Sequence, residues 1–144
     1  MGAEKPILLL VEDNPDDRFL ILRAIKRAGL AICVELATNA QEAIKYLEGN
    51  GNYANRERYS LPALIVTDIE MPCMSGLELL TWIKGQTELA GIPVVVMSTT
   101  GDREQALKKG ASEYLDKTHN YKNLIGILEA LCSQCCSVPS ILLN

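Results

Sequence analysis

The 144-residue sequence lacks the features of a membrane protein and of a nucleic-acid-binding protein. No apolar run approaches the about 20 residues that a helix needs to span a bilayer, so no membrane segment is expected. The first residues, Met1 to Lys5, lack a basic region followed by an apolar stretch, so the protein is predicted to be cytoplasmic. Acidic residues outnumber basic ones by 18 to 14, without a basic stripe, which argues against nucleic-acid binding.

Histidine and cysteine occur in numbers that fit neither a complete zinc site nor a disulfide framework. The only histidine, His119, lies in a polar segment and is assigned no role. Five cysteines are an odd number in a chain without an export signal, which predicts reduced thiols. Three of them resemble half of a zinc site that no second pair completes, so helix-end packing is favoured and an intermolecular bridge stays open for Cys132, Cys135 and Cys136.

The length and the hydrophobic pattern predict one α/β domain. Repeats and low-complexity segments are absent, and 144 residues suffice for a core without disulfides. Short apolar runs alternate with longer amphipathic ones, which is the pattern of a parallel sheet with helices on both faces. The domain is predicted to span residues 1–136, followed by a short tail at 137–144.

The apolar runs predict five strands, at residues 6–11, 32–37, 63–67, 94–97 and 112–115. The second of these is expected near an edge of the sheet. Asn14 and Asn39 are predicted to cap the first two helices, and the third helix is predicted to begin at about Ser75. The last helix is predicted from about Tyr121 to Gln134.

Polar residues gather where the predicted strands end. They follow the first, third, fourth and fifth strands, and they are Glu12, Asp13, Asp68, Ser98 and Lys117. Ligands bind at the carboxyl ends of the strands in open parallel sheets, so these side chains are expected to share one crevice. The neighbouring acids Asp16 and Asp17 are interpreted differently, as residues that favour the positive N-terminal end of a helix.

This set of side chains predicts a metal site that receives phosphate. Clustered carboxylates repel one another and need a cation, and an all-oxygen set of ligands suits Mg²⁺. A carboxylate that attacks phosphorus gains from a cation beside it, while a lysine and a hydroxyl hold the other oxygens. A site of this composition is therefore suited to receive phosphate.

The order of these motifs resembles the receiver domain of two-component response regulators. The motifs are Val11–Asn14 (VEDN), Val66–Pro72 (VTDIEMP), Ser98, and then Tyr114 with Lys117. Together they extend over roughly residues 5–134, and their order at four strand ends makes coincidence improbable. The resemblance implies a flavodoxin-like, doubly wound sheet of five parallel strands in the order 2-1-3-4-5.

The resemblance also implies roles for individual residues. Asp68 is similar to the phosphoryl acceptor, and Lys117 to the lysine that binds the phosphate. Glu12 and Asp13 are similar to the acidic pocket for Mg²⁺, to which Asp68 and the backbone carbonyl of Glu70 add ligands.

Further roles that the resemblance implies concern the response to phosphate. Ser98 is similar to the hydroxyl that hydrogen-bonds the new phosphate, and Tyr114 to the ring that turns inward as that hydroxyl moves. Glu70 and Thr100 are similar to the positions that tune the lifetime of the phosphorylated state. The output surface would comprise the fourth helix, the fifth strand and the fifth helix.

The partners implied by the resemblance are proteins. The phosphoryl donor would be a phosphohistidine on a sensor histidine kinase or on a histidine phosphotransfer protein, and a protein target would lie downstream. Such a module assists its own phosphorylation and slow dephosphorylation but is not otherwise an enzyme, and a homodimer stays open. The polar loop at residues 50–60 and the lack of an output domain are similar to the small regulators that partner bacterial phytochromes.

Two departures from the family pattern bear on this interpretation. Family members usually carry a cis proline after the lysine, whereas Thr118 follows Lys117 here. A cis bond without proline costs about 2.5 to 4 kcal/mol, so a trans bond and a somewhat displaced Lys117 are predicted. The segment between Ser98 and Tyr114 is about three residues shorter than is common, close to one helical turn, so a short fourth helix is predicted.

These departures keep alternative functions open. A receiver-like interaction module that no longer uses phosphate would bind its partner without Mg²⁺. A flavin-binding module is a further alternative, because flavodoxin-like folds bind flavin mononucleotide at the same edge. A hydrolase with an aspartyl-phosphate intermediate ranks lowest, because its nucleophile would more often follow the first strand in an Asp-x-Asp arrangement, which Glu12-Asp13-Asn14 lacks.

Overall fold

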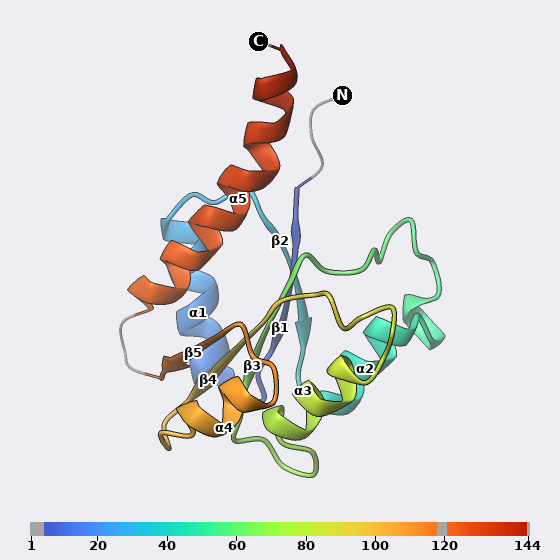
Figure 1. The fold of residues 1–144 in the computed structure, drawn as a ribbon, viewed down its shortest axis with the longest axis vertical. Coiled ribbons are helices and arrows are strands. Elements are labelled where there is room, and N and C mark those ends of the chain that lie inside the picture. The colour runs from blue at the N-terminus through green and yellow to red at the C-terminus, as the bar shows by residue number, and fades with distance from the viewer. Residues whose placement is uncertain (1–4, 118–120, 144) are drawn as a thin grey trace.

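Five parallel strands form the centre of the protein (Figure 1). The computed structural model describes residues 5–117 and 121–143, with side chains as far as Ser133. The strands are β1 (Ile7–Val11), β2 (Cys33–Ala37), β3 (Leu64–Asp68), β4 (Val94–Ser98) and β5 (Glu113–Asp116). Their order in the sheet is β2-β1-β3-β4-β5, which confirms the predicted flavodoxin-like topology with the second strand at an edge.

Helices cover both faces of the sheet. They are α1 (Pro15–Arg27), α2 (Ala40–Glu48), α3 (Gly76–Lys84), α4 (Arg103–Lys108) and α5 (Lys122–Leu143). Figure 1 shows α1 and α5 on one side of the sheet, with α2 and α3 on the other. The six residues of α4 confirm the predicted short fourth helix.

The alternation of side chains along β1 divides the core into two layers. Leu8 and Leu10 are buried in the layer that also contains Ile21 of α1 and Leu128 of α5. Leu9 and Val11 are buried on the opposite face, in the layer that contains residues of α2 and α3. Both faces are covered, which is why the sequence of β1 is continuously apolar.

Side chains at the helix starts set the positions of α1, α2 and α3. Asn14 accepts hydrogen bonds from the backbone N–H groups of Asp16 and Asp17, and Asn39 caps α2 in the same way, as predicted. At α3, Ser75 and Glu78 form a reciprocal capping box. Each of these caps follows a strand directly or after a short loop, so it fixes the helix start at the carboxyl edge of the sheet.

The last helix differs from its predicted extent. α5 continues to Leu143, so the predicted end near Gln134 is wrong, and residues 137–143 continue the helix. Pro139 lies within this extension and lacks the backbone N–H that would donate to the carbonyl four residues before it. The domain boundary after residue 136 stays a prediction. Within the described residues, no helix combines the length and the apolar content needed to cross a membrane.

The loop at residues 50–60 is packed against the domain rather than extended. It contains a short 3-10 helix, η1 (Gly51–Tyr53). The guanidinium of Arg56 donates to the carbonyl oxygens of Tyr46 at 2.7 Å, Leu47 at 2.6 Å and Tyr59 at 2.8 Å. Arg56 thus adds hydrogen bonds to carbonyls in the last turn of α2 and ties the loop to that helix.

Gly76 allows α3 to begin in direct contact with the end of β3. A Cβ atom at this position would lie 2.1 Å from the backbone oxygen of Asp68 and 2.9 Å from Cα of Ile69. Both neighbours are backbone atoms that cannot rotate away. The absence of a side chain at Gly76 therefore determines how closely α3 approaches the strand that carries Asp68.

Gly76→Ala is expected to lower the free energy of unfolding by about 2 kcal/mol or more, because the added methyl group must push α3 away from β3. Gly126→Ala in α5 is the control, because its Cβ would meet nothing within 4 Å. That change should stabilise the helix by up to about 1 kcal/mol. Urea denaturation of both variants measures the difference, and equal stabilities would contradict the close approach at Gly76.

Candidate functional site

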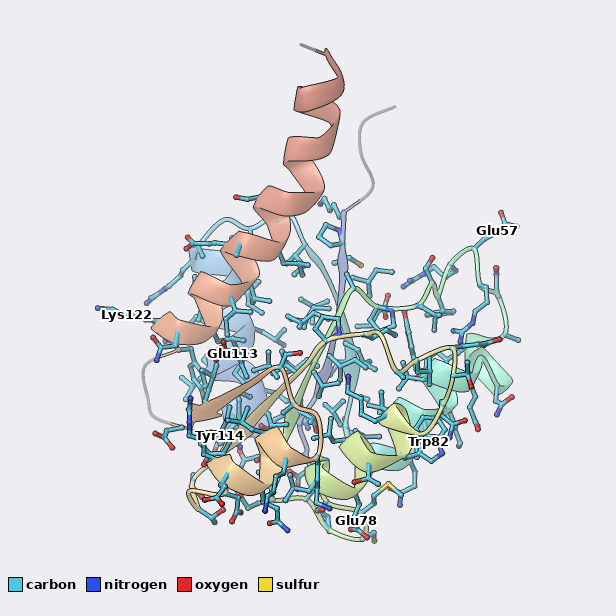
Figure 2. The ribbon with its side chains drawn as sticks, in the orientation of Figure 1. Glu57, Glu78, Trp82, Glu113, Tyr114 and Lys122 are labelled. Atoms are coloured by element: carbon cyan, nitrogen blue, oxygen red, sulfur yellow. The ribbon has the colours of Figure 1, made fainter. Side chains whose placement is uncertain are left out.

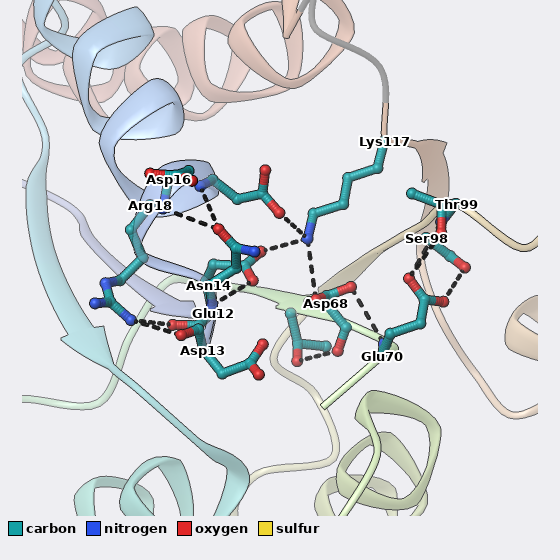
Figure 3. Close-up of polar contacts among 12 residues, drawn as sticks. Glu12, Asp13, Asn14, Asp16, Arg18, Asp68, Glu70, Ser98, Thr99 and Lys117 are labelled. Atoms are coloured by element: carbon teal, nitrogen blue, oxygen red, sulfur yellow. Dashed lines mark hydrogen bonds and ion pairs between the residues drawn. The ribbon is translucent and has the colours of Figure 1, made fainter. Parts of the chain in front are cut away.

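The side chains predicted to share a crevice do lie together at the carboxyl edge of the sheet (Figure 3). Glu12 and Asp13 follow β1, Asp68 ends β3, Ser98 ends β4 and Lys117 follows β5. The ends of β1, β3 and β4 are neighbours in the sheet, so strand order brings these residues close. The predicted gathering of these side chains at one edge of the sheet is thus present.

Three carboxylates form the acidic part of the site. Glu12, Asp13 and Asp68 each offer an oxygen within 4.8 Å of the others. Glu12 is 0% exposed and Asp68 is 2% exposed. Burial, opposed by hydrogen bonds from Lys117, raises the pKa of Glu12 to about 7 and also raises the pKa of Asp68.

The chemistry of these donors fits a hard divalent cation. All three ligand atoms are carboxylate oxygens, which Mg²⁺ and Mn²⁺ prefer. Oε1 of Glu12 is buried, and the ammonium of Lys117 lies 2.9 Å from it. One ammonium shared among several carboxylates leaves the group with excess negative charge, which a divalent cation would offset.

Lys117 lies at the centre of the acidic group. Its Nζ atom is 3.0 Å from Oδ2 of Asp68, 2.9 Å from Oε1 of Glu12 and 2.7 Å from Oδ2 of Asp17. Burial alone would lower the pKa of Lys117, but hydrogen bonds to the three carboxylates raise it overall. The lysine is therefore charged and within reach of Asp68. The displacement of Lys117 relative to the corresponding lysine of family members stays a prediction.

Asp17 is a site residue that the sequence interpretation missed. It was interpreted only as an acid that favours the start of a helix, yet its carboxylate makes the shortest of the contacts to Lys117. The first turn of α1 begins at the same sheet edge, where the Asn14 cap holds it. The side-chain direction that brings Asp17 to a lysine 100 residues later has no signature in the local sequence.

Arg18 holds the backbone of the acidic loop. Its guanidinium donates to the carbonyl oxygens of Glu12 at 3.0 Å and Asp13 at 3.1 Å. The backbone N–H of Asn14 donates to Oε2 of Glu12 at 3.1 Å. These bonds fix the turn between β1 and α1 and were not predicted. They orient the acids before any ligand arrives.

The Glu70 side chain contacts the segment that follows β4. The hydroxyl of Ser98 donates to Oε2 of Glu70. The hydroxyl of Thr100 lies 3.2 Å from the same oxygen and 2.6 Å from Oδ2 of Asp102. The backbone N–H of Thr99 donates to Oε1 of Glu70 at 3.2 Å. The backbone N–H of Glu70 in turn donates to Oδ1 of Asp68 at 3.2 Å. The Ser98 hydroxyl is thus bonded to Glu70 and not to Asp68.

Tyr114 lies in the core beside this segment. It is 4% exposed and pairs with Val96 in the β4–β5 register, two residues before the pair of Ser98 and Asp116. Its hydroxyl is buried without a hydrogen-bond partner among the described residues. The ring is therefore already turned inward while Ser98 is bonded to Glu70. It belongs to the same buried cluster as Ala106 of α4, and Figure 2 labels it near that helix.

Other predictions concern residues away from the site. Cys33 and Cys73 form no disulfide with another described residue. Cys132 is buried and donates to the carbonyl oxygen of Ala31 at 3.7 Å, which agrees with packing near the end of the domain. Four positions lie outside the described residues or side chains: Thr118 with its predicted trans bond, His119, Cys135 and Cys136.

Comparison with known proteins identifies the family. The model of the response regulator receiver domain matches residues 8–129, a range that contains every predicted site residue. The chain belongs to the response regulator receiver family, which confirms the resemblance seen in the sequence. It is a module of two-component signalling.

The narrower similarity is to small response regulators. The probable methanogenesis regulatory protein FilR2 of Methanothrix harundinacea is 35% identical over 138 residues, which cover 91% of this chain and 84% of FilR2. The phosphorylated cyanobacterial phytochrome response regulator RcpA is 32% identical, with a TM-score of 0.76 over 93% of this chain and 96% of RcpA. This similarity agrees with the predicted likeness to phytochrome-associated regulators.

A second structure bears on the acidic group. The Mn²⁺-bound form of response regulator Rcp1, a protein of Synechocystis, is 29% identical, with a TM-score of 0.74 over 89% of this chain and 92% of that one. Segments similar to this chain also occur within histidine kinases. The family thus includes a metal-bound member, a phosphorylated member and segments joined to kinases.

Proposed function

We propose that the protein is a single-domain response regulator that accepts a phosphoryl group on Asp68 from a phosphohistidine donor. The observation that carries this proposal is the position of Asp68, buried at the end of β3 with the ammonium of Lys117 at 3.0 Å and two further carboxylates beside it. A purely structural ion pair would need the lysine but not two further carboxylates, which repel Asp68. The donor is a sensor histidine kinase or a histidine phosphotransfer protein.

Four groups would hold Mg²⁺: the carboxylates of Glu12, Asp13 and Asp68 and the backbone carbonyl of Glu70. When bound there, the ion supplies positive charge that offsets the negative charge developing on the transferred phosphoryl group. The Mn²⁺-bound form of Rcp1 supports a divalent cation in this family. The preference for Mg²⁺ is part of the proposal.

The chain's own residues account for the transfer. A carboxylate oxygen of Asp68 attacks phosphorus, a P–O bond forms, and the P–N bond to the donor imidazole breaks as that imidazole leaves with its electron pair. Lys117 offsets the charge of Asp68 before the reaction and of a phosphoryl oxygen after it. The protein assists this step and the later slow hydrolysis but turns over no other substrate.

The switch uses the bonds of the segment after β4. Ser98 is bonded to Glu70 in the present structure, so it must exchange that carboxylate for a phosphoryl oxygen on Asp68. The new negative charge also repels Glu70, whose backbone N–H already contacts Asp68. Ser98 and Tyr114 act as the switch pair. Because the Tyr114 ring is already buried, it responds to the movement of Ser98 by shifting within the core rather than by turning in from the surface. Glu70 with Thr100 tunes the lifetime. A beryllofluoride complex in which Ser98 kept its bond to Glu70 would refute this exchange.

The output of the switch is a contact with another protein. Movement of Ser98 alters the start of the segment that leads to α4, whose Arg103 donates to the carbonyl oxygen of Tyr114 at 3.4 Å. The surface of α4, β5 and α5 therefore carries the signal to a downstream partner or a second copy. The site of action is the cytoplasm, where the kinase domains that donate phosphate lie.

Incubation with acetyl phosphate, with and without Mg²⁺, tests the proposed function. We expect intact mass spectrometry to show one added phosphoryl group with Mg²⁺ and none in the presence of excess chelator, because the three carboxylates repel an incoming anion without a cation. Absence of labelling under both conditions would favour the alternative, a receiver-like interaction module that binds partners without phosphate. The six-residue α4 and Thr118 are the features that motivate that alternative.

A further inference from the structure

Lys117 has three carboxylate partners, and they differ in what else they can do. Glu12 and Asp68 belong to the group of acids whose oxygens lie within 4.8 Å of one another. Asp17 contacts Lys117 at 2.7 Å but is not a member of that group among the described residues. It is therefore the partner of Lys117 that a cation at the acidic group leaves untouched.

A cation at the acidic group creates a conflict for Lys117. Two positive charges would then share Glu12 and Asp68, and like charges at such distances repel strongly in a buried site. The side chain of Lys117 is only 8% exposed, so it cannot simply move into water. It needs a carboxylate that is close to Asp68 and is not a ligand.

We propose that Asp17 is a positioning residue that holds Lys117 beside Asp68 when Glu12 and Asp68 bind a divalent cation. This inference rests on the proposed function, and it deepens it by naming the partner that keeps the phosphate-binding lysine in place. The Asn14 cap supports the role, because it fixes the first turn of α1 through a 3.0 Å bond to the backbone N–H of Asp17.

Asp16 provides a matched control. It precedes Asp17 in the same first turn of α1, it carries the same charge, and it is exposed. Neither Asp16→Asn nor Asp17→Asn removes a proposed metal ligand, so both change the long-range field at the acidic group in a similar way. Only the second removes a contact to Lys117.

The test is calorimetric titration of the full chain with Mg²⁺. Asp17→Asn is expected to weaken Mg²⁺ binding about tenfold, because Lys117 is left to compete for Glu12 and Asp68, whereas Asp16→Asn should weaken it at most about twofold. In a Lys117→Ala background the two asparagine variants should behave alike. Equal effects in the wild-type background, or a difference that persists without the lysine, would overturn the inference.

A second measurement does not depend on the folding of a Lys117 variant. The Nζ–H signal of a buried, ion-paired lysine is protected from exchange with water and is observable by nuclear magnetic resonance. With saturating Mg²⁺ we expect that signal in the wild type and in Asp16→Asn, and its loss in Asp17→Asn. A signal that survives in Asp17→Asn would show that Lys117 needs no such partner.

The outcomes separate this inference from the proposed function. A wild-type chain that binds Mg²⁺ and takes up phosphate, together with asparagine variants that behave alike, overturns only the role of Asp17. A wild-type chain that neither binds Mg²⁺ nor takes up phosphate overturns both.

Discussion

Replacement of Asp68 by asparagine is expected to abolish labelling by acetyl phosphate. An amide oxygen is a poor nucleophile and does not attack phosphorus. It also carries no charge that would pair with Lys117 or with a cation. The variant should nevertheless fold, because burial raises the pKa of Asp68 and therefore favours an uncharged group at this position. Intact mass spectrometry under saturating Mg²⁺ measures the loss.

Asp116→Asn is the matched control for this experiment. Asp116 ends β5, pairs with Ser98 in the β4–β5 register and is exposed at the same edge of the sheet. It makes the same change in charge without touching Lys117 or the acidic group. Labelling of Asp116→Asn at the wild-type level, with none in Asp68→Asn, is the expected pair of results. Persistent labelling of Asp68→Asn would place the acceptor elsewhere.

The metal-free protein is expected to lose stability as the pH rises. The pKa of Glu12 is raised from its usual 4.5 to about 7 by burial, so the folded state binds more protons than the unfolded state between these values. Stability from this group is full below pH 4.5 and is lost as the pH rises through about 7. A shift of this size corresponds to about 3 kcal/mol, and Asp68 contributes in the same direction.

Glu12→Gln should remove most of this pH dependence. Urea denaturation at pH 5 to 8 with chelator present is expected to show a flatter profile and a gain of about 2 kcal/mol near pH 8, because the amide needs no proton to stay neutral. Added Mg²⁺ should restore the stability of the wild-type protein at high pH. It should raise the stability of Glu12→Gln by a smaller amount. A wild-type stability that is constant or increases between pH 5 and 8 would contradict the raised pKa.

Glu57→Gln is the control for the change in charge. Glu57 lies on the loop at residues 50–60 and is exposed, and Figure 2 shows it at the outer end of that loop. Its replacement should leave the slope of stability against pH unchanged. A similar flattening in Glu57→Gln would indicate an effect of net charge rather than of the buried carboxylate.

The parts of the fold that depend on local patterns were predictable from the sequence. The continuous apolar runs of β1 and β3 identify buried parallel strands, and Asn14 and Asn39 mark helix starts through the hydrogen bonds that their side chains accept. Strand order followed from the resemblance. Because all strands are parallel, their polar ends had to meet at one edge, which placed Asp68 and Lys117 together.

The parts that were not predictable depend on side-chain directions between distant elements. Asp17 and Lys117 are 100 residues apart in sequence. Asp16 and Asp17 both carry a carboxylate in the first turn of α1, and the sequence does not tell which of them contacts the lysine. The bond between Glu70 and Ser98 likewise joins the loop after β3 to the end of β4. The length of α5 was missed for a local reason, since the short segment at residues 137–143 extends an existing helix and does not have to fold alone.

Chemical mapping of the phosphorylated residue tests the central claim most directly. The wild-type protein is labelled with acetyl phosphate and Mg²⁺ and then reduced with borohydride, which converts an acyl phosphate of aspartate into homoserine. Tandem mass spectrometry should locate homoserine at position 68 and at no other acid of the site. Reduction at Glu12, Asp13 or Asp17 instead, or no reduced residue in a protein that gained phosphate, would contradict the assignment of Asp68.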